Sequence, residues 1–313
     1  MQKEITIRDI KPDDLNDLVE LYDSVWPETA GTYEGKTKWM LSSNPLYGVC
    51  ACADDKIIAS RPSFQSNIYY RHVKINAVQC GNSSVRKDYR RLGIFTKMNR
   101  EFLKVFFDEN NNDLIYNVSV EASKLAYQKL GWEYINALSK QTYFTNIWNV
   151  LLKTKLDIRK LTGNIQYDHQ SIPPLDNFDH KLLEVRESNF RKSKNIHTYY
   201  SKNFFEWRLN SDTNIAFFTI EGLGTVIYKI GIRNSLRVIT IGEVFLYEYN
   251  HVNLREIIKL LKKEFKVDII EVLITENHPC FSFYKKIGFV SNPFKKYLNL
   301  GVKVVSDEMK KIC

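Results

Sequence analysis

The sequence predicts an α/β protein of two similar domains, each with a mixed, mostly antiparallel sheet flanked by helices. The first observation is length, because 313 residues are too many for one average domain and about right for two. The second is the order of expected elements in the first half, where an antiparallel meander precedes the main helix. The third is a motif that recurs about half a chain later. A doubly wound dinucleotide fold would alternate strand and helix from the start, so it fits poorly.

In the first half, alternation and helical periodicity place the elements in order. A strand over 4–8 leads into an amphipathic helix that starts after Pro12, with carboxylates in its first turn. The segments that follow are extended chain over 46–53, 56–70 and 75–85, a helix over about 93–108, a strand over 113–118, a helix over 121–130 stopped by Gly131, and strands over 132–144.

The middle of the chain differs in composition. Residues 147–201 are polar and basic and contain Pro173 and Pro174, so we expect a partly helical connecting region. The predicted domains are therefore 1–146, a connector over 147–203, and 204–313. In the last domain we expect strands over 216–221, 225–232 and 236–247, a helix over 252–265, a strand over 269–275, a helix over 279–287 and a final strand near Phe289.

One short motif occurs twice. Residues 126–132 and 283–289 both contain Tyr, two polar residues, an aliphatic residue, Gly and an aromatic residue. Each copy closes a short helix after a strand. Because the flanking elements also match, an internal duplication is the best account.

The composition is that of a globular protein, with 44% apolar and 26% charged residues. No apolar run reaches the roughly 18 residues of a membrane helix, and the N-terminus lacks a secretory pattern. We therefore expect a cytoplasmic protein without membrane insertion, either a monomer or a homodimer. Five cysteines without zinc spacing predict buried thiols and no metal. The net charge of +9 favours either an anionic partner or simple solubility, and the absence of a basic stripe with interleaved aromatics argues against nucleic acid.

The segment 83–96 has the features of a phosphate site. It lies between a predicted strand and the longest helix of the first half, and it contains Arg90, Arg91 and Gly93. The first N–H groups of a helix lack partners, and the helix dipole adds positive charge there. Glycine permits close approach of a ligand, and arginines add charge-assisted contacts. The alternative is a basic helix start in which the glycine serves chain geometry alone.

Residues 89–95, Tyr-Arg-Arg-Leu-Gly-Ile-Phe, resemble the acyl-CoA pyrophosphate loop of the GNAT superfamily of N-acetyltransferases, whose pattern is Arg/Gln-x-x-Gly-x-Gly/Ala. Arg90 and Gly93 match, whereas Phe95 stands where Gly or Ala is usual and leaves less room beside the phosphates. The resemblance implies that acetyl-CoA, or another acyl-CoA, is the cosubstrate. The residues that it implies as contacts are Ser83, Ser84, Val85, Arg90, Arg91, Leu92, Gly93, Ile94, Phe95 and Thr96.

The resemblance also implies catalytic roles. Tyr127 sits where a family tyrosine often protonates the departing thiolate, and Val120 stands where relatives often carry Asn. A neutral amine must attack the thioester, so a base or a water chain must remove a proton. The candidate bases are Glu121, Glu243 and the terminal carboxylate of Cys313.

The second half keeps the tyrosine motif but not the phosphate loop. Asn277 lies seven residues before Tyr284, yet residues 242–255 contain no Arg-x-x-Gly pattern. The resemblance therefore implies one acyl-CoA site, in the first half. The loop and the Trp207-Arg208 pair also resemble enhanced-intracellular-survival-type acetyltransferases.

The predicted function is acyl-CoA-dependent transfer to a primary amine of a small molecule, with an amino sugar or nucleotide-linked amino sugar as the favoured acceptor. The basic charge is the reason to favour an anionic acceptor. The alternative is a non-catalytic acyl-CoA-binding or sensing protein, which Val120 and Phe95 would suit. Four early aromatic residues contact the acceptor or belong to the core: Trp26, Tyr33, Trp39 and Tyr47.

Overall fold

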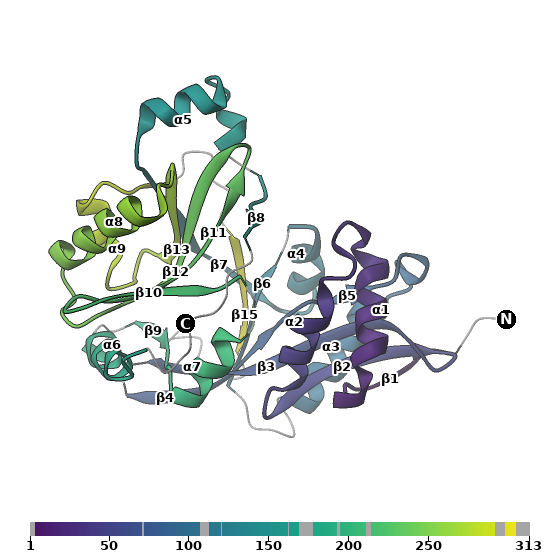
Figure 1. The fold of residues 1–313 in the computed structure, drawn as a ribbon. Helices are drawn as coiled ribbons and strands as arrows, with labels where there is room; N and C mark the ends of the chain where they lie inside the picture. Colours follow the sequence, from purple (N-terminus) through teal and green to yellow (C-terminus); the bar gives the residue numbers. More distant parts are fainter. Residues whose placement is uncertain are drawn as a thin grey trace. The chain divides into compact units, whose positions relative to one another are not determined.

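The structure, a computed structural model, describes residues 4–70, 72–106, 113–119, 121–161, 163–168, 178–192, 195–210, 214–291 and 298–304. These residues form two compact units (Figure 1). The first contains the described residues of Met1–Asn136, Ile196–Tyr199 and Asn299–Cys313, and the second those of Ala137–Asn195 and Tyr200–Leu298.

The first unit is built on a mixed sheet. Its strand order is β1-β2-β3-β4-β6-β15, and every neighbouring pair is antiparallel except β4 and β6. The strands are β1 (Thr6–Asp9), β2 (Leu46–Ala53), β3 (Lys56–Tyr70), β4 (Val73–Cys80), β6 (Leu114–Ser119) and β15 (Leu298–Val304). Two short strands, β5 (Ser84–Val85) and β9 (Ile196–Thr198), pair with β3.

Helices cover both faces of this sheet. They are α1 (Leu15–Val25), α2 (Tyr33–Leu41), α3 (Ile94–Lys104) and α4 (Glu121–Gln128). On β3, Ser60 contacts Tyr22 of α1, whereas the next residue, Arg61, contacts Tyr127 of α4. Because successive strand residues point to opposite faces, α1 and α4 cover opposite faces. The core on the α3 and α4 side contains Val78, Cys80, Met98, Phe102 and Ile115.

The second unit repeats the plan. Its strand order is β7-β13-β12-β11-β10, with β12 and β13 parallel and the other neighbouring pairs antiparallel. The strands are β7 (Glu133–Phe144), β10 (Ala216–Ile220), β11 (Gly224–Arg233), β12 (Leu236–Leu246) and β13 (Ile269–Thr275), with β8 (Gln166–Tyr167) on β11 and β14 (Val290–Ser291) on β7. The helices are α5 (Ile147–Thr154), α6 (Lys181–Lys192), α7 (Lys202–Leu209), α8 (His251–Phe265) and α9 (Phe281–Lys286).

The two units share a sequence of elements. In the first, the strands β2 to β5 are followed by α3, the parallel strand β6 and α4; in the second, β10 to β12 are followed by α8, the parallel strand β13 and α9. The main apolar cluster of the second unit lies between its sheet and α8, where Leu254, Ile257 and Leu261 are fully buried. The predicted fold class, a mixed and mostly antiparallel sheet flanked by helices, is confirmed.

Several predicted elements differ in detail. The strand expected over 75–85 is two strands, β4 and β5, and no strand had been predicted over 298–304. Residues 147–201 contain α5 and α6, and Pro173 and Pro174 lie outside the described residues. The domain boundaries at 146 and 203 stay a prediction.

The described residues contain neither a candidate membrane-spanning helix nor a candidate metal site. Within them, no helix is both long and apolar enough to cross a membrane. No group of three His, Cys, Asp or Glu side chains in the same part of the chain is placed to hold a metal ion.

Candidate active site

A β-bulge marks the edge of the candidate site. Ser63 of β3 pairs with Cys80, and Ser60 of β3 pairs with Ser84. Between these two pairs β3 advances by three residues and the opposing chain by four. One extra residue on one strand is a bulge, and it re-aims the chain that follows. Pro62 of β3, which has no N–H to donate, lies opposite this irregular stretch. Asn82 takes up a positive φ of 35° there.

Beyond the bulge the two parallel strands separate. β4 and β6 pair only from Ala77–Leu114 to Gln79–Tyr116, and β5, which follows β4, pairs with β3. β15 pairs with the other edge of β6 over Leu114–Ser119. The other edge of β5 therefore has no strand partner in the described part of the chain. Arg90 Nε donates to Val85 O across 3.1 Å at the end of β5. Such an edge offers backbone groups to an extended, amide-containing ligand.

The start of α3 presents unpaired backbone donors. Arg91 and Gly93 both have left-handed φ angles, 67° and 74°, and Gly93 is the residue before the helix. Lys97 N makes the first helical bond, to Gly93 O at 3.0 Å, while the N–H groups of residues 91–96 have no acceptor among the described residues. A left-handed residue followed by a helical one turns successive N–H groups to one side, which suits an anion.

The side chains of the loop divide between solvent and core. Arg90, Arg91 and Leu92 are exposed, whereas Ile94 is buried. A Cβ added to Gly93 would meet nothing within 4 Å, so the glycine is required by its φ and the space beside it is open. Phe95 packs edge-on against Tyr127 with ring centroids 5.2 Å apart, so this half-buried ring packs against the core.

Tyr127 lies beneath this helix start. Its side chain is 1% exposed. The hydroxyl oxygen accepts from Arg61 Nη1 at 2.8 Å and from Asn117 Nδ2 at 2.9 Å. With both acceptor positions filled by donors, its own proton remains available to a third group. That arrangement fits a proton donor.

Arg61 and Asn117 are site residues that the sequence analysis missed. Arg61 is fully buried and also donates to Ser83 Oγ at 3.3 Å and Cys80 Sγ at 3.2 Å. The sequence feature that could have pointed to Arg61 is a charged residue, followed by Pro62, in the middle of a predicted strand. Ser84, a predicted contact, is buried and shares a hydrogen bond with Ser60 at 3.0 Å. Thr96 is half-buried on the first turn of α3.

The equivalent position in the second unit is closed. β12 also carries a register shift, between the pairs Ile227–Glu243 and Tyr228–Ile241. However, the helix that follows, α8, is capped by Asn250, whose side chain accepts from Asn253 N at 2.8 Å. An amide oxygen therefore occupies the place that an anion would take.

Glu243, a predicted base, lies in the second unit beside a buried arginine. Arg186 Nη2 donates to Glu243 Oε2 at 2.8 Å, and Glu243 Oε1 lies 3.9 Å from His278 Nε2. Burial lowers the pKa of His278 to about 4, against the opposing attraction of Glu243. The side chain of Glu121, together with Val120 and Cys313, lies outside the described residues.

The early aromatic residues separate into two groups. Trp39 is buried against Phe64, and Tyr47 packs on Phe106. Trp26 and Tyr33 are half-buried, and their ring centroids lie 5.6 Å apart. The latter two therefore remain accessible on the α1 side of the sheet.

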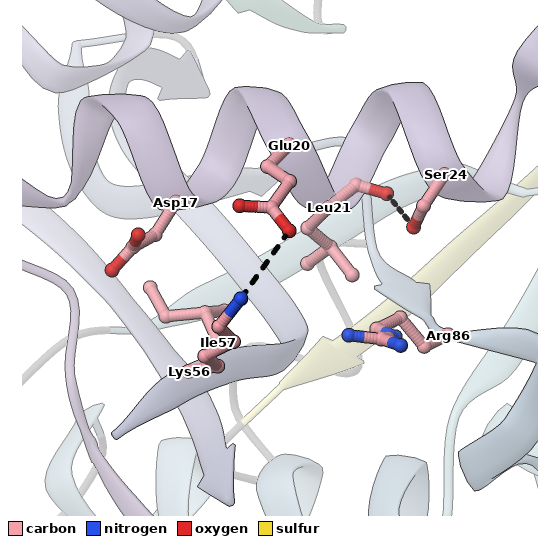
Figure 2. A pocket seen from close by; sticks show the side chains of 7 residues that line it. All are labelled: Asp17, Glu20, Leu21, Ser24, Lys56, Ile57 and Arg86. Atoms are coloured by element: carbon pink, nitrogen blue, oxygen red, sulfur yellow. Dashed lines mark hydrogen bonds and ion pairs between the residues drawn. The ribbon is translucent and has the colours of Figure 1, made fainter. Parts of the chain in front are cut away.

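A pocket beside α1 lies apart from these groups. It is lined by Asp17, Glu20, Leu21, Ser24, Lys56, Ile57 and Arg86 (Figure 2). Glu20 and Lys56 form an ion pair across it at 3.9 Å. Its lining includes neither Tyr127 nor the start of α3, and its charges are balanced between two carboxylates and two cations.

Comparison with known proteins agrees with this geometry. Residues 6–135 match the family model of the acetyltransferase (GNAT) domain. The first part of the chain is therefore similar to GNAT acetyltransferase domains. A search of curated proteins gives no match.

Solved structures share the fold over nearly the whole chain at low sequence identity. A GCN5-related N-acetyltransferase from Kribbella flavida has a TM-score of 0.67 and 12% identity, covering 96% of this chain and 71% of its own. One from Anabaena variabilis has a TM-score of 0.68 and 8% identity, covering 97% and 73%. A glucosamine N-acetyltransferase region of a fungal multi-domain beta-N-acetylglucosaminidase has a TM-score of 0.57 and 14% identity, covering 97% and 38%. The likeness to enhanced-intracellular-survival-type enzymes stays a prediction.

Proposed function

We propose that this protein is an acyl-CoA-dependent N-acyltransferase that transfers an acetyl group to a primary amine of a small molecule. The observation that carries the proposal is the run of N–H groups at the start of α3 that meet no acceptor among the described residues, next to Arg90 and Arg91 and near the buried hydroxyl of Tyr127. These groups fit a pyrophosphate at one end and a thioester at the other. Of the other predicted contacts, Ser84 and Val85 form β5 and Ser83 directly precedes it. The edge of β5 away from β3 has no strand partner among the described residues.

The proposed reaction is direct transfer. The neutral amine nitrogen attacks the thioester carbonyl carbon, the new C–N bond forms, and the C–S bond breaks. The CoA sulfur leaves as a thiolate and takes the proton of the Tyr127 hydroxyl. The amine loses a proton to a base, for which Glu121, Glu243 and the carboxylate of Cys313 remain the candidates.

The proposed acceptor is an amino sugar, free or linked to a nucleotide. The fold neighbour with a glucosamine N-acetyltransferase region supports this class. Trp26 and Tyr33 supply half-buried aromatic faces of the kind that stack on sugars. The net charge of +9 supports an anionic form.

Calorimetric titration with acetyl-CoA tests the proposal. We expect one equivalent to bind, with affinity about tenfold weaker in Arg90→Ala, because one charge-assisted phosphate contact is lost. Arg159→Ala is the matched control, since Arg159 is a highly exposed arginine of the second unit, and it should bind like the parent. An absence of binding by the parent would rule out acetyl-CoA as the cosubstrate.

A screen of amines then separates enzyme from sensor. Release of CoA with an amino sugar would establish the transferase. Binding of acetyl-CoA without CoA release from any amine would favour the alternative, a non-catalytic acyl-CoA-binding protein.

A further inference from the structure

Three arginine side chains are buried among the described residues, and one differs from the others. Arg186 is paired with Glu243, and Arg233 makes two bonds to Glu271, at 2.6 and 2.8 Å. Arg61, the most deeply buried, has no carboxylate partner in the described part of the chain. Among the described residues, the other two buried arginines each have a carboxylate partner.

The surroundings of Arg61 are aromatic rather than acidic. Its guanidinium carbon lies 5.2 Å from the ring centroids of Phe102 and Tyr127 and 5.5 Å from that of Trp132. Ring faces attract a cation but do not neutralise its charge. Its Nε has no hydrogen-bond acceptor among the described residues. A buried charge left in this way is costly, so its position calls for a reason beyond packing.

The described atoms to which the Arg61 side chain donates all belong to the candidate active site. The contacts are Tyr127 Oη, Ser83 Oγ in the bulge and Cys80 Sγ at the end of β4. The shortest of the three is the one to Tyr127, at 2.8 Å. The net positive charge is thus directed at the oxygen that would lose its proton.

We propose that Arg61 is a positioning residue for acyl transfer, which holds the Tyr127 hydroxyl as the proton donor. When the C–S bond breaks, the proton moves from Tyr127 Oη to the CoA sulfur, and the oxygen takes up the negative charge. The Arg61 guanidinium stabilises that charge until the oxygen regains a proton from solvent. This inference rests on the proposed function and adds a residue that the sequence motif does not contain.

Steady-state kinetics in two backgrounds test the inference. Arg61→Met keeps an unbranched, apolar side chain close to the arginine stem in size and removes the charge. We expect kcat to fall about 100-fold, the loss typical of one preorganised donor, with KM for acetyl-CoA within threefold. In a Tyr127→Phe background the same substitution should change kcat less than threefold, because the two residues act through one proton. Arg61→Lys should recover part of the lost kcat.

Two results would overturn it. One is an equal fall of kcat in both backgrounds; the other is a rise of KM with kcat unchanged. If Arg61→Met does not fold, as judged by circular dichroism, the same cycle is run with Arg61→Lys, which keeps a cation in the site.

The affinities of CoA and acetyl-CoA test the role of Arg61 without turnover. At pH 9 a fraction of the free CoA thiol is ionised and a cationic site would select that thiolate, whereas acetyl-CoA carries no charge at sulfur. Arg61→Met should weaken CoA binding about tenfold and Arg61→Lys less, and both should weaken acetyl-CoA binding less than twofold. Equal weakening of both would make Arg61 a structural residue. If the parent binds both ligands but acetylates no amine, the proposed function fails while this comparison still tests Arg61.

Discussion

Gly93 and Asn250 stand at the same place in their units, directly before the helix that follows the bulged strand, but only Asn250 caps its helix. The Asn250 side chain accepts from Asn253 N at 2.8 Å. Gly93 has no side chain, and the first-turn N–H groups of α3 meet no acceptor in the described residues. One unit therefore offers an anion site that the other fills with its own amide.

Gly93→Ala should weaken acetyl-CoA binding about five- to tenfold. Gly93 has φ 74°, which strains a residue with a Cβ by about 1 kcal/mol, and no neighbour blocks the added atom. Relief of that strain would move the loop away from the ligand. Gly222→Ala is the matched control, because Gly222 has φ 71° and equally open surroundings in the second unit. Calorimetry should show weaker binding for Gly93→Ala alone; the same loss in both variants would refute the role of the loop.

Tyr127→Phe should lower kcat at least 100-fold, because a general acid contributes about that much, and leave the Kd of acetyl-CoA within twofold. It should also lower the free energy of unfolding by about 1–3 kcal/mol, since Arg61 and Asn117 lose their acceptor. Steady-state kinetics and urea unfolding measure the two effects. Tyr284→Phe, at the matching position of the second unit, should keep the parent kcat. An unchanged kcat in Tyr127→Phe would remove the tyrosine from the mechanism.

The stability of the second unit should fall as the pH is lowered from about 6.5 to 4. Burial lowers the pKa of His278 to about 4, so in this window the unfolded chain binds the proton and the folded chain does not. Stability from this group is present above pH 6.5 and is lost as the pH falls, by about 2 kcal/mol. Urea unfolding at pH 6.5 and 4.5 measures it. His278→Gln should have a shallower pH dependence than the parent; equal slopes would assign the effect to other groups.

Glu271→Leu should destabilise the second unit by about 3–5 kcal/mol, because it leaves Arg233 buried without a counter-charge. Lys140, which also contacts Glu271 at 2.7 Å, is partly exposed and can turn to solvent. The double variant Arg233→Met, Glu271→Leu should lose less than Glu271→Leu alone. Urea unfolding of the three proteins gives the order, and an additive loss in the double variant would contradict it.

Local patterns predicted much of the fold. Strands β2 and β3 have the predicted bounds, because the turn at Asp54 and Asp55 separates two extended segments. The left-handed Gly93 follows from a glycine placed between arginines and a helix. These are features that neighbours in the sequence decide.

Features that depend on distant contacts were not predicted. Arg61 and Tyr127 are 66 positions apart, and no local pattern pairs them. Residues 147–201 were predicted to be partly helical, but the bounds of α6 were not predicted, because its buried face combines Leu182 and Phe190 with a charged residue, Arg186. The pocket beside α1 likewise joins a helix to a strand turn and to Arg86.

The strand order of the first unit bears on how the chain folds as it leaves the ribosome. Ser119 of β6 pairs with Asn299 of β15, 180 positions later. During synthesis β6 therefore keeps an open edge while the whole second unit is made, and an open edge invites pairing with other chains. The later unit can finish folding before the earlier one, so the first unit depends for completion on β15, which is translated after the second unit.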